Sequence, residues 1–196
     1  MKVFGFVIFL AFISVSSFAA ENEKSKKVYF DLDLGSGIVS TSGSAQDLKK
    51  TFESKGFSGD SPINSNLGVY LPLSEESLLG AKISYTHISL SQMDDRKNKI
   101  SFDVSSAAAY YQYHISGVKR GFYIGAGVGG SFAVNLMPDS SNFLGVPKCG
   151  LAIPKEIGYK VPLSGMFSFN IVLHSETNWI SGGAVQTDTL NVGLSF

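Results

Sequence analysis

The chain has 196 residues and a formal net charge of zero, with 16 basic and 16 acidic side chains. This balance gives no electrostatic reason to bind nucleic acid. The single cysteine, Cys149, excludes an internal disulfide and a metal site built from several thiolates. Charged residues make up only 16% of the chain, whereas aromatic residues reach 12% and there are 21 glycines. This composition suits thin strands with one face against lipid.

The first twenty residues have the pattern of a secretory signal peptide. Lys2 supplies the basic start, an apolar run follows from Val3 to Ile13, and Ser17 and Ala19 are the small residues that precede cleavage. We expect a signal peptide at 1–19, a short segment at 20–26 and one barrel domain at 27–196. No later stretch has the roughly 18 apolar residues of a transmembrane helix, so a membrane-spanning mature chain would have to be a closed barrel.

Apolar side chains alternate with small or polar ones along most of the mature chain, whereas a period of 3.6 residues is not convincing anywhere. The alternation predicts eight strands: Val28 to Val39, Ile63 to Leu71, Leu78 to Leu90, Ile100 to Tyr113, Gly121 to Val134, Gly150 to Val161, Phe167 to Glu176, and Thr187 to Phe196.

The connections between these strands alternate in length. The short ones are Pro72 to Ser77, Ser116 to Arg120 and Pro162 to Gly165, and the long polar ones are Ser40 to Pro62, Ser91 to Lys99, Asn135 to Lys148 and Thr177 to Gln186. Such alternation is typical of a meander with one rim in the periplasm and the other outside the cell. The sequence therefore predicts an all-β fold, a closed eight-stranded antiparallel up-and-down transmembrane β-barrel.

The two faces of the strands differ in composition, but a soluble barrel with an inward apolar face would show the same contrast. Glycines and aromatic residues favour the membrane. Gly125, Gly127 and Gly129 would leave holes in a soluble core, whereas a narrow lumen needs small residues. Several aromatic residues beside the short turns are expected to form a membrane-interface girdle: Tyr70, Tyr110, Phe122, Tyr159, Phe167 and Phe196.

The last seven residues, Leu190 to Phe196, alternate strictly and end on a phenylalanine. With the signal peptide and the eight predicted strands, this ending resembles the small outer-membrane barrels of the OmpA, OmpX and opacity-protein type, over essentially the whole mature chain. The resemblance implies a place in the bacterial outer membrane, contact with its lipids and lipopolysaccharide, and insertion by the barrel assembly machinery through the last strand. It also implies a lumen plugged by side chains.

Eight polar side chains are expected to form a paired structural network in the lumen: Asp31, Asp33, Lys82, Asp103, Glu156, Lys160, His174 and Glu176. A proton or ion path is the alternative interpretation of the same residues. The sixth strand departs from the pattern, because Lys155 falls in the lipid-facing phase next to Pro154. We expect a bulge at Pro154 or a position of Lys155 at the rim.

His174, Ser175 and Glu176 are the most suggestive residues for catalysis, but adjacent side chains on a strand point to opposite faces. Lipid A deacylases, another class of outer-membrane barrel, place a His and a Ser two residues apart on the lipid-facing side, and we find no such pair. The outer lipid-facing positions are instead expected to hold Phe102, Val104, Phe132 and Leu173. We therefore expect no catalytic residues, no metal, no cofactor and no enzyme.

The most economical hypothesis for function is a non-catalytic, structural or surface-interaction role, with a monomeric or weakly associated barrel. The long connections could bind a surface ligand. A lipid A-modifying enzyme of the deacylase type and a narrow pore for small solutes are the alternatives. Cys149, just after a long connection, is expected to be an unpaired thiol.

Overall fold

The computed structural model describes residues 28–59, 61–92, 99–136, 148–164, 167–180 and 182–196. The expected signal peptide and the 20–26 segment lie outside the described residues and stay predictions. The same holds for most of the connections Ser91 to Lys99 and Asn135 to Lys148.

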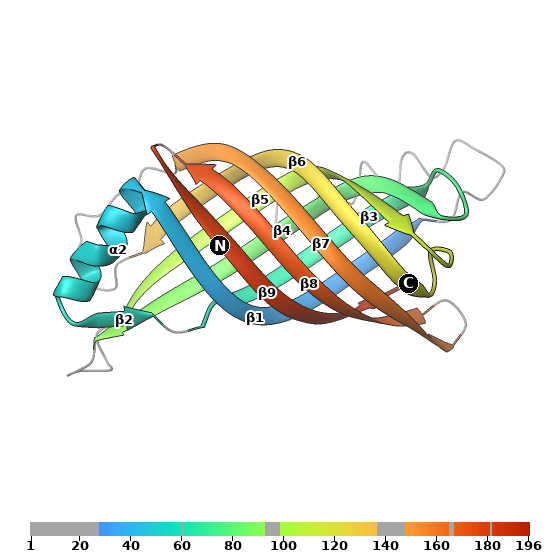
Figure 1. Ribbon diagram of the computed structural model, residues 1–196, viewed down its shortest axis with the longest axis horizontal. Coiled ribbons are helices and arrows are strands. Elements are labelled where there is room, and N and C mark those ends of the chain that lie inside the picture. The colour runs from blue at the N-terminus through green and yellow to red at the C-terminus, as the bar shows by residue number, and fades with distance from the viewer. Residues whose placement is uncertain (1–27, 60, 93–98, 137–147, 165–166, 181) are drawn as a thin grey trace.

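Eight antiparallel strands form a closed barrel, as the alternation predicted (Figure 1). Each strand pairs with the next, β4 pairs with both β3 and β5, and β1 pairs with β9, so every strand has two partners. The strands of the barrel are β1 Tyr29–Gly43, β3 Ile63–Pro72, β4 Ser77–Gln92, β5 Lys99–His114, β6 Gly121–Leu136, β7 Lys148–Ser164, β8 Phe167–Ile180 and β9 Gly183–Ser195.

The connection between β1 and β3 holds a helix and a short strand that the period analysis missed. Helix α2, Ser44–Ser54, is followed by β2, Phe57–Gly59, which pairs with the outer end of β4. The ring of Phe52 on the helix packs edge-on against Phe57, with centroids 6.1 Å apart. Within the described residues, no helix is long and apolar enough to cross a membrane. Figure 1 shows α2 and β2 together at one rim of the barrel.

Two local expectations are wrong. The connection Thr177 to Gln186 is not a long loop, because Ile180 pairs directly with Gly183 and only two residues separate β8 from β9.

No bulge occurs at Pro154, since the β7–β8 register runs through it without a shift. Pro154 lacks an N–H, yet the register with β6 is the same on both sides of it, and a register shift occurs only at Pro162/Ser164. Pro154 faces the lumen. Lys155 is exposed on the outer wall midway along β7, paired with Ala126 and Ser175, and so does not lie at the rim either.

The strands point their apolar side chains outward and their polar side chains inward. In β1, Leu32 and Leu34 are more than half exposed, whereas Asp31 and Asp33 are buried. The opposite distribution would be expected of a soluble barrel. The outer wall therefore suits lipid, and the interior must satisfy its own polar groups.

Three tyrosines fill the inner part of the lumen, and their rings lie against glycines. Tyr70, Tyr110 and Tyr123 are almost completely buried. The contacts are Tyr70 with Gly68, Tyr110 with Gly125 and Gly127, and Tyr123 with Gly158. A Cβ atom at any of these glycines would overlap a ring, so the small residues make room for the large ones.

Gly125→Ala should lower the free energy of unfolding by about 1–3 kcal/mol, because the added methyl group would lie 2.6 Å from the Tyr110 ring. Gly130→Ala is the matched control, since the nearest atom to its new Cβ is 3.9 Å away. Urea unfolding in lipid vesicles, followed by the fluorescence of the single tryptophan, measures both. An equal loss in the two variants would contradict this account of the packing.

Candidate functional site

The interior holds two ion pairs that cross the lumen between strands that are not neighbours. Lys82 on β4 contacts Glu156 on β7, and Lys160 on β7 lies 3.1 Å from Asp31 on β1. Gln112 on β5 joins the two pairs, because its amide donates to Asp31 at 3.1 Å and to Glu156 at 2.9 Å. All five side chains are buried. They tie opposite sides of the barrel together.

The ammonium groups of these pairs also lie over the buried tyrosine rings. Lys82 Nζ is 4.9 Å from the centre of the Tyr110 ring, and Lys160 Nζ is 5.2 Å from the centre of the Tyr123 ring. Contacts of this kind gain strength where water is excluded. Ion pairs and rings together close the inner part of the lumen.

A second group of polar residues continues the network toward the outer rim. His174 lies between two carboxylates, with Nδ1 3.8 Å from Glu156 and Nε2 3.4 Å from Glu176. Asn178 donates to Glu176 at 2.9 Å. Nearer the inner rim, Asn170, the cross-strand partner of Lys160, donates to Asp33 at 3.4 Å. A separate pair of amides, Asn191 and Asn64, bridges β9 and β3 at 2.8 Å.

The outer end of the interior is apolar. Ile88, Val104, Ile180 and Val185 form a buried cluster, with Val39 and Phe102 packed against it. Val104 and Phe102 were expected on the lipid-facing wall, and this expectation is wrong. The interior thus runs from tyrosines and ion pairs at one end, through amides and His174, to an apolar cluster at the other.

The structure places all but one of the expected lumen residues inside the barrel: Asp31, Asp33, Lys82, Glu156, Lys160, His174 and Glu176 are buried. The exception is Asp103, which lies on the outer wall. The phase of β5 is opposite to the expected one, so Val104, Ala108 and Tyr110 face inward. Apolar residues occur on both faces of β5, and the alternation therefore did not reveal which face is inside.

Tyr70 and Tyr110 do not belong to the interface girdle, because both side chains are buried in the lumen. The other aromatic residues assigned to it are exposed on the outer wall near the short turns: Phe122, Tyr159, Phe167 and Phe196. Their rings form two pairs, Phe122 with Tyr159 at 4.7 Å and Phe167 with Phe196 at 5.9 Å between centroids. Position beside a turn did not distinguish inward from outward tyrosines.

Asp103 hydrogen-bonds to His87, a contact that the sequence analysis missed. The two residues are cross-strand partners, and His87 Nδ1 lies 2.6 Å from Asp103 Oδ1. His87 and Ser89 are two residues apart on the outward face. The expectation that the chain lacks a His and a Ser spaced in this way on the lipid-facing side is therefore wrong. Within the described residues, however, no hydrogen bond joins His87 to a serine, and such a bond is how a base activates a serine.

The three residues His174, Ser175 and Glu176 do not form a catalytic group. His174 and Glu176 face the lumen, whereas Ser175 lies on the other face of β8. Among the described residues, no group of three or more His, Cys, Asp or Glu side chains could hold a metal ion. Cys149 is a free and exposed thiol.

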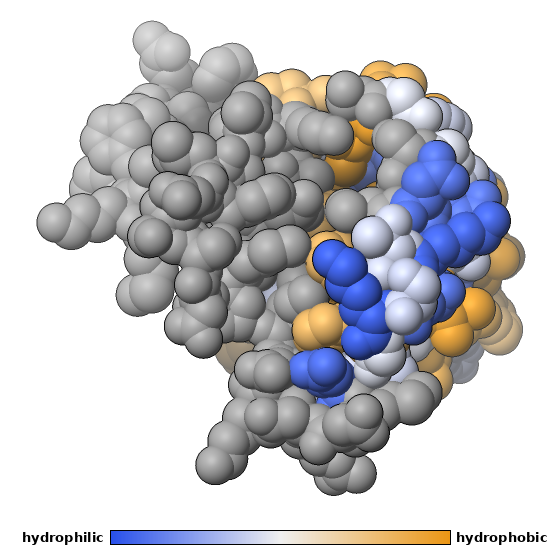
Figure 2. Space-filling model, turned by 90° about the vertical axis from the view of Figure 1, so that its left-hand side faces the viewer, coloured by the Kyte–Doolittle hydropathy of each residue, from blue (hydrophilic) through white to orange (hydrophobic). Residues whose placement is uncertain are grey.

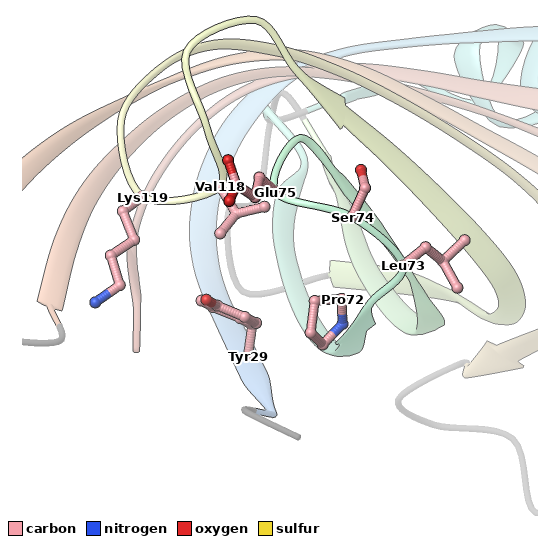
Figure 3. Close-up of a pocket in the computed structure, with 7 residues that line it drawn as sticks. All are labelled: Tyr29, Pro72, Leu73, Ser74, Glu75, Val118 and Lys119. Carbon is pink, nitrogen blue, oxygen red and sulfur yellow. The ribbon is translucent and has the colours of Figure 1, made fainter. Parts of the chain in front are cut away.

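A shallow pocket lies at the inner rim, between the turn that joins β3 to β4 and the turn that joins β5 to β6 (Figure 3). Its lining residues are Tyr29, Pro72, Leu73, Ser74, Glu75, Val118 and Lys119. Glu75 and Lys119 are exposed, so the pocket lacks the buried polar groups that orient a ligand in a specific site.

The sequence matches no protein-family model and no curated protein. The structure is similar to that of Ail, the attachment invasion locus protein of Yersinia pestis, in complex with the heparin analogue sucrose octasulfate, with a TM-score of 0.53 and 16% identity over 87% of this chain and 99% of that chain. It is also similar to Neisserial surface protein A, with a TM-score of 0.51 and 13% identity over 86% of this chain and 95% of that chain. The chain has the fold of a small outer-membrane β-barrel. At these identities, the likeness concerns the fold.

In this barrel, Glu156→Gln should lower the free energy of unfolding by about 3–5 kcal/mol, because it leaves the buried Lys82 ammonium without its carboxylate. The control is Glu53→Gln, which breaks the exposed Lys49–Glu53 pair on α2 and should change stability little. Urea titration of both variants in vesicles compares them. A loss at Glu156 no larger than at Glu53 would contradict a structural role for the network.

Proposed function

We propose that the chain is an integral protein of the bacterial outer membrane, with a structural or surface-interaction role and a side-chain-filled, non-catalytic lumen. The observation that carries this proposal is the distribution of polarity. Leu173 and Leu190 on the outer wall are 61% and 55% exposed, whereas His174 and Asn191, next to them in sequence, are buried. Exposing so many apolar side chains to water would be unfavourable in free energy, whereas contact with lipid would stabilise them.

Export and assembly belong to the same proposal. The signal peptide would direct the chain out of the cytoplasm, and the barrel assembly machinery would act on the C-terminal strand. The closing seam supports a role of this strand in assembly. Phe196 exchanges two backbone hydrogen bonds with Phe30, at 2.8 and 3.0 Å, and their rings stack 5.4 Å apart. Lipids and lipopolysaccharide would then surround the finished barrel.

A filled lumen favours this role over a narrow pore. Lys82, Glu156, Lys160 and Asp31 span the interior in pairs, and the tyrosine rings occupy the space between them. A lipid A-modifying enzyme is the other alternative, and it would need an activated nucleophile. A role in surface interactions fits the architecture better than either alternative, because connections carried on a rigid barrel are common sites of binding.

The outer rim offers lysines for such interactions. Lys49, Lys50 and Lys55 lie on or next to α2, which also carries Asp47 and Glu53, and Lys50 and Lys55 are exposed. Lys49 pairs with Glu53 at 3.8 Å. Figure 2 shows this end of the molecule, with hydrophilic surface gathered on its described part. The Ail structure contains a sulfated heparin analogue. A polyanionic surface ligand is therefore the class that we propose for this rim.

Refolding into phospholipid vesicles should give a band that migrates faster on a gel before heating than after it, because the closed barrel resists the detergent. In planar bilayers, the same preparation should show no reproducible single-channel steps. Folding without lipid or detergent would contradict the membrane assignment, and regular conductance steps would contradict the filled lumen.

Sucrose octasulfate should bind the refolded protein, and replacing Lys49, Lys50 and Lys55 by Gln should reduce its affinity at least tenfold and flatten the salt dependence. Lys119→Gln, which removes a single charge at the opposite rim, is the control for position and should leave binding unchanged. Isothermal titration at two salt concentrations measures this. Undetectable binding, or equal losses in both variants, would contradict a polyanion site at α2.

A further inference from the structure

We propose that Tyr85, His87 and Asp103 form a binding site, on the outer wall of the barrel, for the sugar headgroup of a glycolipid in the surrounding membrane. We call these three residues the wall cluster. The proposal deepens the proposed function and rests on it, because it requires the outer wall to face the lipids of the outer membrane.

One carboxylate organises the wall cluster. Asp103 on β5 accepts a hydrogen bond from the ring of its cross-strand partner His87 on β4, with 2.6 Å between Nδ1 and Oδ1. Tyr85, two residues before His87 on the same face of β4, lies close enough to Asp103 for an electrostatic interaction. The hydrogen bond to Asp103 restricts the rotation of the His87 ring. The cluster is therefore ordered before any ligand arrives.

The contacts leave polar atoms available to a ligand. With Nδ1 bonded to Asp103, the Nε2 atom of His87 remains, on a side chain that is 36% exposed. Three serines with outward-facing positions adjoin the cluster. Ser105 is the cross-strand partner of Tyr85. Ser89 lies two residues after His87, and its partner Ser101 lies two residues before Asp103. Imidazole, carboxylate and hydroxyl groups together offer both donors and acceptors.

The wall cluster lies where lipid headgroups meet the barrel. His87 is ten residues beyond Ser77, the inner end of β4. At about 3.3 Å per residue and a tilt near 40°, this corresponds to roughly 25 Å, the height of the apolar band of such barrels. Exposed apolar residues flank the cluster at this level, with Ile63 opposite His87 on β3 and Phe132 opposite Ser105 on β6. The cluster thus adjoins the lipid at the outer edge of the band.

The chemistry fits a sugar better than a phosphate. Vicinal hydroxyls donate to carboxylates and accept from imidazole and hydroxyl groups, and a partly exposed Tyr85 ring can pack against the C–H face of a sugar. A phosphate would instead meet the negative charge of Asp103. A barrel wall has no structural need for this cluster, because apolar residues occupy neighbouring positions on β3 and β6.

The test compares lipids retained by the refolded protein. The full mature chain is refolded into vesicles with equal amounts of monoglucosyl diacylglycerol and phosphatidylglycerol of matched acyl chains, and retained lipids are counted by native mass spectrometry. We expect at least fivefold preference for the glycolipid. Asp103→Asn should abolish the preference, and Tyr85→Phe, which keeps the ring, should reduce it.

Asp188→Asn is the matched control. Asp188 lies on the outward face of β9 and pairs with Gln186 at 3.1 Å rather than with a histidine, so this variant removes the same charge and should keep the preference. Equal retention by the native protein and Asp103→Asn would overturn the proposal, as would equal retention of both lipids. Loss of an acyl chain from the bound glycolipid would overturn it too, because the site would then act as an enzyme. Gel migration before and after heating, recorded first, separates these results from a failure of the barrel itself.

Discussion

Closure of the strand ring is the constraint on which the rest of the structure depends. Lipid offers no partner for a backbone N–H or C=O group, so every strand must find two neighbours. The seam between β1 and β9 supplies the last of these, from Asp31 with Ser195 to Gly43 with Gly183. A closed ring also has only one outer face, and its contact with lipid decides where apolar side chains point. The inverted distribution of polarity follows from the contact of this outer face with lipid.

The dense filling of the lumen by side chains is the second consequence of closure. Eight strands enclose a narrow space, so a charge there must be compensated by other lumen side chains. Lys82 and Glu156 do this across the lumen, and His174 and Glu176 lie together on one strand. Large rings fit only where the facing backbone lacks a side chain, as with Tyr123 and Gly158. A lumen filled in this way leaves the rims and the outer wall as the surfaces available for recognition.

Alternation along the strands predicted the all-β class and most strands, because a strict period of two is a strong signal along β1, β4 and β9. The closed ring was predicted from the alternating lengths of the connections together with the resemblance to outer-membrane barrels. It did not settle the phase of β5, where Tyr110 and Tyr111 put an aromatic ring on each face. Helix α2 was missed because its apolar positions are few, and its anchor Phe57 lies outside the helix. The contact of His87 with Asp103 depends on register between strands, which no single-strand pattern contains.

Lipid contact at individual methyl groups tests the central claim most directly. Val192 on the outer wall is 50% exposed, and Val172, on the neighbouring strand, is fully buried in the lumen. Both residues can be observed in the native sequence by labelling valine and leucine methyl groups and recording nuclear Overhauser effects from lipid acyl chains. The account predicts strong effects at Val192, Leu190 and Leu194 and none at Val172. Acyl-chain effects at Val172, or their absence at Val192, would contradict it.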